Sequence, residues 1–141
     1  MVWTVLLHTT ETRGSRSGTE KRRPHAPDSR RRHSGAPTTR SRLLESVYAA
    51  ALAIELGRRA VQFTREVKIP VSYDGEALDT HFRLDFLVDG RVVVEVKAVE
   101  QLARVHEAQL LTYLRLGGFP VGLLLNFNVV LMKQGIVRRI L

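Results

Sequence analysis

The sequence predicts an α/β fold with a mixed β-sheet flanked by two helices. Two segments carry apolar residues at helical spacing, and three consecutive segments between them alternate apolar and polar residues or are rich in valine. A short, almost entirely apolar segment follows the second helix. The predicted order is helix, three strands, helix, and one or two strands. Strands joined by short turns pair antiparallel, whereas a strand reached through a helix can lie parallel to its neighbour.

The first predicted helix begins with Ser41 as its N-cap and ends at a glycine, residue 57. The segment 61–73 then alternates apolar and polar residues, which is typical of a strand with one buried face. Pro70 within this strand indicates an edge position or a β-bulge. A turn follows at residues 73–76.

The second half of the chain supplies the other elements. Its last strands differ in kind, because the first is apolar enough for the middle of a sheet and the second is expected at an edge. The predicted elements are strands at 81–88 and 91–99, a helix at 102–118, and strands at 121–127 and 135–141.

Charge divides the 141-residue chain into two parts. Residues 1–41 hold 9 Lys or Arg and 3 Asp or Glu, and residues 42–141 hold 13 and 11, so the net charges are +6 and +2. Residues 9–41 contain no large apolar side chain, so we predict a basic, low-complexity, disordered segment at 1–41 and a folded domain at 42–141. The basic segment either binds phosphates or is a solvated tail without function.

Two absences narrow the class of protein. The chain has no cysteine, which excludes disulfides and zinc-cysteine sites and favours a cytoplasmic protein. No apolar run approaches the roughly 20 residues that a membrane-spanning helix needs, so we expect no membrane association.

The loop between the two middle strands decides which charged residues share a face of the sheet. A two-residue turn at Asp89-Gly90 would mix charged and apolar residues on both faces. A three-residue loop at 88–90, with Gly90 in the left-handed conformation, separates them, and we predict this loop. The apolar face then holds Leu84, Phe86, Val92, Val94 and Val96. The other face holds Arg83, Asp85, Leu87, Val93, Glu95 and Lys97, with Asp85 opposite Val93 and Arg83 opposite Glu95.

Two carboxylates and a lysine on one face of a sheet suit phosphodiester hydrolysis. Adjacent carboxylates repel and raise each other's pKa, and a divalent cation removes that cost. Mg²⁺ prefers one or two carboxylates together with water and phosphate oxygens. The spacing D-x9-E-x-K, at Asp85, Glu95 and Lys97, therefore fits a metal-dependent site. An ion-paired surface face is the alternative interpretation.

These motifs resemble the PD-(D/E)XK nuclease superfamily, and within it the GxxExxY family. The resemblance covers about residues 43–141 and implies a restriction-endonuclease-like αβββαβ core. The matching stretches are LLESVY, REVKIPVSYDG, FRLDFLV, VVVEVKAVE, HEAQLLTYL and GLLLNFNV.

The resemblance also implies roles for individual residues. Asp85 and Glu95 would be metal ligands, Lys97 the catalytic lysine, and Glu45 a helix carboxylate that joins the metal or orients water. Gln109 and Tyr113 are similar to the Q-x-x-x-Y element of RecB-type exonucleases, and their spacing places them on one helix face. The implied cofactor is Mg²⁺ or Mn²⁺. Tyr113 as a core aromatic residue is an alternative, and for His106, on the same face, we prefer a solvated or capping histidine.

The sequence departs from the family at one position. Arg42 stands where the family name places its first glycine, three residues before Glu45. One hypothesis is that the segment up to about residue 41 is not native to the family.

Two classes of function remain open on the sequence. The first is a nuclease acting on nucleic acid, with DNA as the expected substrate. The second is a non-catalytic module that binds nucleic acid or protein, which the near-neutral domain favours. A homodimer or a protein partner is expected to complete the binding groove, and a poorly folded remnant is a third possibility.

Overall fold

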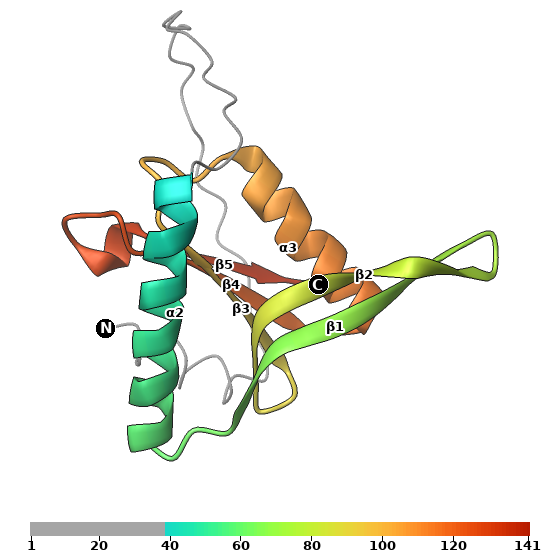
Figure 1. Ribbon diagram of the computed structural model, residues 1–141, viewed down its shortest axis with the longest axis horizontal. Coiled ribbons are helices and arrows are strands. Elements are labelled where there is room, and N and C mark those ends of the chain that lie inside the picture. Colours follow the sequence, from blue (N-terminus) through green and yellow to red (C-terminus); the bar gives the residue numbers. More distant parts are fainter. Residues whose placement is uncertain (1–38) are drawn as a thin grey trace, which may run out of the picture.

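A computed structural model describes residues 39–141 as two helices packed on a five-stranded sheet (Figure 1). Of the segment 1–41 that was predicted to be disordered, residues 1–38 lie outside the described residues, whereas residues 39–41 belong to the first helix. The elements are α2 (Thr39–Arg58), β1 (Phe63–Tyr73), β2 (Glu76–Val88), β3 (Val92–Lys97), α3 (Arg104–Gly117), β4 (Val121–Asn126), the 3₁₀ turn η1 (Met132–Gln134) and β5 (Ile136–Ile140). In the described part of the chain, no helix has the length and apolar character needed to cross a bilayer.

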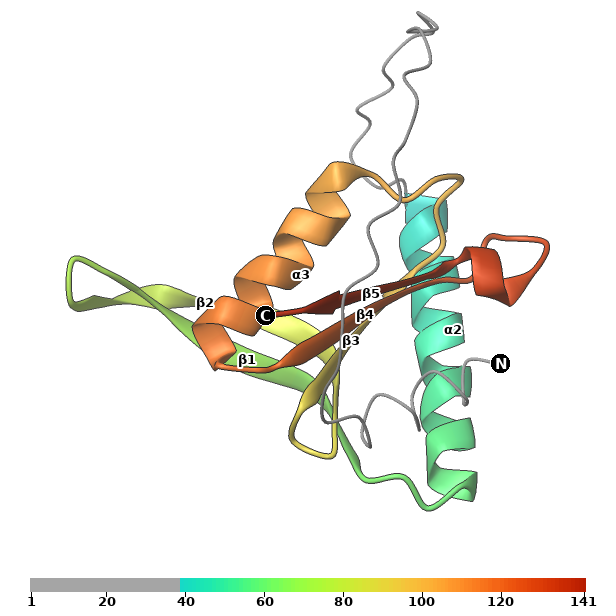
Figure 2. The ribbon, with the colours of Figure 1, turned by 180° about the vertical axis from the view of Figure 1, so that it is seen from behind.

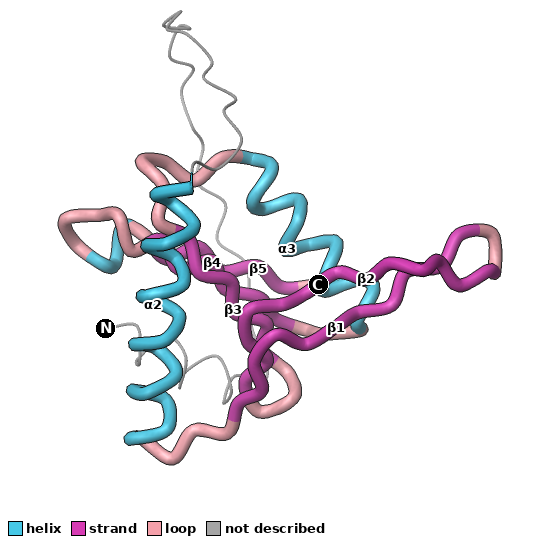
Figure 3. Tube along the Cα trace, in the orientation of Figure 1, coloured by secondary structure: helices cyan, strands magenta, loops and turns pink. Residues whose placement is uncertain are grey.

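The sheet confirms the predicted fold class. Its strand order is β1-β2-β3-β4-β5, with β3 and β4 parallel and the other neighbours antiparallel (Figure 3). All six residues of β4 are buried, because this strand lies inside the sheet with helices over both faces. The chain returns to β4 through α3, which allows the parallel pairing.

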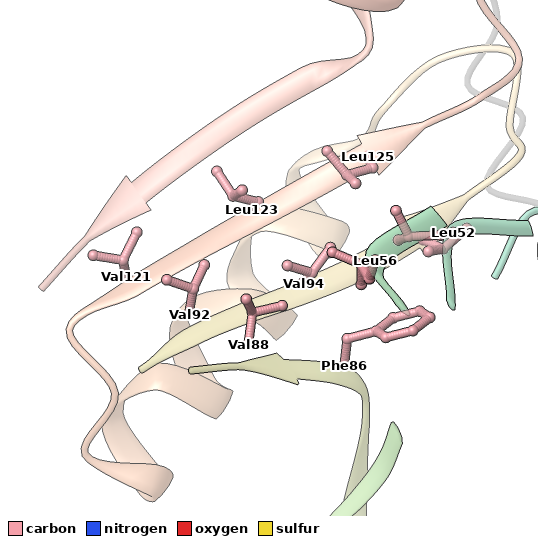
Figure 4. Close-up of a cluster of buried hydrophobic side chains, with 10 residues drawn as sticks. Leu52, Leu56, Phe86, Val88, Val92, Val94, Val121, Leu123 and Leu125 are labelled. Carbon is pink, nitrogen blue, oxygen red and sulfur yellow. The ribbon is translucent and has the colours of Figure 1, made fainter. Parts of the chain in front are cut away.

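Helix α2 covers one face of the sheet. Leu52 and Leu56 pack on a buried cluster from β2, β3 and β4 that includes Phe86 and Val94 (Figure 4). The helix starts at Thr39, two residues before the predicted N-cap, so Ser41 lies inside the helix rather than at its end.

Helix α3 covers the opposite face. Leu110 and Leu114 are fully buried against Val93 and Leu124. Gly118 caps the C-terminus of the helix, and its φ of 65° is the left-handed conformation that favours glycine. The sheet therefore has a core on both faces, and a side chain at the C-terminal end of β3 lies near both helices.

Strands β1 and β2 continue as a two-stranded hairpin beyond the rest of the sheet (Figures 1 and 2). The hairpin closes through Asp74 and Gly75, both with positive φ, as a type I′ turn requires. The register shifts between Pro70 and Ser72, and β1 is an edge strand, so both expectations for Pro70 are met. Strand β2 begins at Glu76, five residues earlier than predicted.

The predicted loop between β2 and β3 was one residue out of place. Val88 pairs with Val92, so the three-residue loop is 89–91 rather than 88–90. Gly90 is left-handed as expected, with a φ of 65°. Extending this register by one residue brings Asp85 level with Glu95, not opposite Val93, and Arg83 is not opposite Glu95. The predicted separation of Val92, Val94 and Val96 from Glu95 and Lys97 holds. Moving the loop by one residue changes the pairing register by two residues, and a change of two keeps each side chain on the same face of the sheet.

Leu84 lies on the other face from the one predicted. It packs with Val93 and Leu110 under α3, whereas Phe86, two residues later, lies under α2. Strand β2 turns over between them, where its pairing with β3 ends. On the neighbouring strand, Glu66 has a φ of 52°, and this left-handed residue accompanies the bend.

Candidate active site

The carboxylates of Asp85 and Glu95 meet where the β2–β3 ladder stops. The last backbone pair is Phe86 with Val94. Beyond it, the Asp85 backbone amide donates to Glu95 Oε1 at 3.1 Å, and the Val96 amide donates to Asp85 Oδ2 at 2.8 Å. Each carboxylate thus accepts a hydrogen bond from the other strand in place of a backbone carbonyl. This exchange fixes the position of both side chains.

Burial disfavours the ionised form of both carboxyl groups. Removal from water is the main cause that raises the pKa of Asp85, against the Val96 hydrogen bond and Lys97, which lower it. Glu95 is only 3% exposed, and burial followed by repulsion from Asp85 raises its pKa to about 8. Each group therefore carries a cost that a bound cation would offset.

Lys97 lies beside the pair. Its Nζ is 3.9 Å from Glu95 Oε2, and the lysine side chain is 14% exposed. At this distance the ammonium lowers the pKa of both carboxyl groups without closing a short hydrogen bond. It therefore keeps hydrogen-bonding capacity for a ligand.

Glu45 reaches the rim of the same site from α2. Its Oε1 accepts a hydrogen bond from the Ala98 amide at 3.3 Å, just beyond the end of β3. Its charge is close enough to Glu95 to contribute to the raised pKa of that carboxyl group. Within residues 39–141, however, no three His, Asp or Glu side chains converge into a ligand group. The structure brings Glu45 near the pair but does not join it to them.

Gln109 and Tyr113 also face the site, from α3. Gln109 Nε2 donates to the Tyr113 hydroxyl, so the predicted pair is formed. Tyr113 is 3% exposed and its ring lies 5.4 Å from that of Phe82. Burial raises the pKa of its hydroxyl, the hydrogen bond with Gln109 lowers it, and the negative charges of Glu95 and Asp85 raise it further. Tyr113 is both a core aromatic residue and a neighbour of the site.

His106 is a capping histidine, as preferred from the sequence. Its Nδ1 accepts a hydrogen bond from the Ala103 amide at 3.0 Å, at the start of α3. Partial burial and the positive charge of Lys97 lower its pKa.

One neighbour of the site was missed in the sequence. Asn126, at the end of β4, is buried and bonds the backbone of Val99 through both ends of its amide. It holds the chain just after Lys97, and a polar residue closing an apolar strand was the available signal. Arg83, on β2, lowers the pKa of Asp85. The sequence predicts Arg83 on the face of the two carboxylates, but its predicted partner across the ladder, Glu95, was wrong.

The donor set fits a hard divalent cation. Two carboxylates suffice for Mg²⁺, which fills its other positions with water and substrate oxygens. Both carboxylates here are held in place by backbone amides, and burial raises the pKa of both. The residues that would hold the ion are Asp85 and Glu95, with Glu45 at the rim.

Comparison with known proteins identifies a family. A family model described as the PD-(D/E)XK nuclease superfamily matches residues 38–140. That span includes all eight elements of the fold and every candidate site residue. Comparisons with curated proteins and with solved structures give no significant match.

Proposed function

Because the chain belongs to the PD-(D/E)XK nuclease superfamily, we propose that it is a Mg²⁺-dependent nuclease that hydrolyses phosphodiester bonds of DNA. The observation that carries the proposal is the meeting of Asp85 and Glu95 at the end of the β2–β3 ladder, beside Lys97. The matching motifs favour its assignment to the GxxExxY family, with Arg42 in place of the first glycine.

Asp85 and Glu95 are the proposed metal ligands. When bound, Mg²⁺ or Mn²⁺ would supply Lewis-acid stabilisation of the negative charge on the phosphate. Holding both carboxylates in advance lowers the cost of binding the ion, because the backbone amides of β2 and β3 already fix them. Glu45 keeps Oε2 for water at the rim, since Oε1 is engaged by the Ala98 amide.

The other residues act on water and on the phosphate. Lys97 donates to the attacking water or to a phosphate oxygen, where its charge stabilises the transition state. Tyr113 accepts a hydrogen bond from Gln109, which leaves the phenolic hydrogen free to be donated to a phosphate oxygen. Attack of water on phosphorus then breaks one phosphorus–oxygen bond, and the leaving oxygen takes up a proton.

The test is cleavage of single- and double-stranded DNA by the full chain with Mg²⁺ or Mn²⁺. We expect cleavage by the wild type, loss of at least about 100-fold for Lys97→Ala, and no loss for Lys133→Ala. Lys133 is an exposed lysine on η1, so it controls for a general loss of positive charge. Equal cleavage by Lys97→Ala and the wild type would contradict the proposed mechanism.

A non-catalytic nucleic-acid- or protein-binding module is the second candidate. The net charge of +2 over residues 42–141 favours it, since a DNA groove usually carries more positive charge. Isothermal calorimetry separates the two candidates. Mg²⁺ or Mn²⁺ binding that Glu95→Gln abolishes supports the nuclease, whereas DNA binding without a metal site supports the module.

The proposal also covers the cellular location of the protein and its oligomeric state. The absence of cysteine favours the cytoplasm. A second copy or a protein partner would add to the binding groove, and β5 offers an edge strand for such contact. Sedimentation of the protein with and without DNA tests this part.

A further inference from the structure

The hairpin beyond the end of the β2–β3 ladder is an arm, defined here as residues 66–83. It projects from the sheet in both ribbon views, at the opposite end of the molecule from η1 (Figures 1 and 2). Apart from Val67, which pairs with Leu84, its paired residues pair only with each other, because the last pair between β2 and β3 involves Phe86. One face of its base packs on α3 through Ile69, which is 5% exposed, and Phe82, which contacts Tyr113.

The opposite face of the arm carries two positive charges side by side. Lys68 and Arg83 are directly paired positions of the antiparallel ladder, and both are exposed. Like charges in such a pair repel and destabilise a hairpin. Arg83 has a loose ion pair with Glu66 at 3.5 Å, in which both side chains are more than 60% exposed. Within residues 39–141, no ion pair involves Lys68.

This positive pair lies next to the candidate active site. Arg83 precedes Asp85 by two residues on β2, a rise of about 6.6 Å along a strand. That spacing is comparable to the separation of successive phosphates in an extended nucleic-acid strand. The positive charge of Arg83 also lowers the pKa of Asp85 and of the Tyr113 hydroxyl. A phosphate at the carboxylates would therefore have its neighbour within reach of the arm.

We propose that Lys68 and Arg83 bind the sugar–phosphate backbone of the nucleic-acid substrate beside the cleaved bond. This inference rests on the proposed nuclease function and names a substrate-binding element for it. An anion between the two cations converts their repulsion into attraction, and the exposed Glu66 contact is easily exchanged for a phosphate. The contact is made to phosphate alone, so it positions the strand without reading its sequence.

The tip of the arm limits this surface. Asp74, Glu76 and Asp79 are exposed there and would repel a phosphate backbone. The bound strand therefore contacts the base of the arm, over about two phosphates, and does not follow the arm to its tip. This arrangement gives a nearly neutral domain a local site for a polyanion.

The experiment measures binding of a fluorescein-labelled 12-nucleotide single-stranded DNA by anisotropy, in EDTA, between 50 and 200 mM salt. The proteins are the full-length wild type, Lys68→Gln, Arg83→Gln, the double variant and the control Lys133→Gln. Each arm substitution is expected to reduce the slope of log K against log salt by about 0.7, and the double variant by about 1.4. The double variant should bind about tenfold more weakly at 50 mM salt, equally for oligo-dT and mixed sequences. All the variants carry the same basic N-terminal segment, so its contribution to DNA binding does not affect the differences between them.

The outcomes separate the arm from the nuclease function. If the wild type cleaves DNA in Mg²⁺ but the double variant keeps the wild-type salt slope, the proposed role of the arm is overturned and the proposed nuclease function is not. A change in Arg83→Gln without one in Lys68→Gln also overturns it, because Arg83 would then act only through Asp85. A wild type that neither binds nor cleaves DNA overturns the proposed function together with this inference. Higher KM with unchanged kcat in the double variant supports the inference.

Discussion

Replacing Glu95 with glutamine is expected to stabilise the protein in alkaline solution and to leave its stability unchanged in mild acid. Glutamine is isosteric and its Oε1 still accepts the hydrogen bond from the Asp85 amide. It cannot ionise, so it avoids the cost of placing a charge at a site that is 3% exposed and next to a second carboxylate. The substitution therefore isolates the ionisation of this one group.

The sign of the effect follows from proton binding. Folding raises the pKa of Glu95 from 4.5 to about 8, so between these values the folded protein binds more protons than the unfolded chain. The free energy of unfolding of the wild type then falls as the pH rises through this window, and the variant lacks this fall. The full shift corresponds to at most about 5 kcal/mol. Sharing of the shift with Asp85 and loss of the ion pair with Lys97 reduce the expected gain to about 2 kcal/mol.

Thermal and urea unfolding in EDTA at pH 5 and pH 8.5 measure the difference. At pH 8.5 the variant should melt roughly 8 °C above the wild type, and at pH 5 the two should melt within about 2 °C. Glu100→Gln, at an exposed position after β3, is the matched control and should show no such difference. Addition of Mg²⁺ at pH 8.5 should raise the melting temperature of the wild type but not of Glu95→Gln. A variant less stable than the wild type at pH 8.5 would refute the reasoning, because the ionised carboxylate would then be net stabilising.

Substitutions at three positions test other parts of the structure. Lys97→Met should raise the pKa of Glu95 further, because the lysine ammonium lowers it. A ¹³C NMR titration of the Glu95 carboxyl carbon measures this pKa, and an unchanged midpoint would exclude the contact. His106→Ala should lower the free energy of unfolding in urea by about 1 kcal/mol, because the helix cap is lost. His106→Gln keeps an acceptor and should retain most of the wild-type stability. Equal losses in the two variants would rule out the cap. Gly135→Ala should cost more than about 2 kcal/mol, since its Cβ would lie 2.1 Å from a backbone carbonyl oxygen of β4; a wild-type melting temperature would contradict that packing.

Much of the fold was predictable because its elements are locally consistent. The alternation before Tyr73, the valines of β3 and the apolar run of β4 each specify a strand, and α3 stops at its glycines as expected, with Gly118 as the C-cap. The parity of the β2–β3 loop placed Glu95 and Lys97 on one face correctly, since parity survives an error of two residues.

The errors lie where tertiary contacts override the local pattern. The alternation of apolar and polar residues cannot show that β2 turns over between Leu84 and Phe86. The bend accompanies a left-handed backbone at Glu66 on the neighbouring strand, a conformation that non-glycine residues rarely adopt. The early part of β2 has no buried face, so no apolar alternation marked it as a strand. The catalytic and metal-binding roles of the site residues stay predictions, because closeness in space does not test catalysis.

The hydrogen bonds at the site also have an implication for the order of folding. Asp85 and Glu95 are ten residues apart in the chain, whereas the contact of Glu45 with Ala98 spans 53 residues. Closing the longer loop loses more chain entropy, so short-range contacts generally form first. We expect the hairpin to close while both carboxylates are still hydrated and ionised, and α2 and α3 to dock afterwards. At neutral pH, completion of the fold without a cation would then take up a proton from solvent, and completion with Mg²⁺ would not.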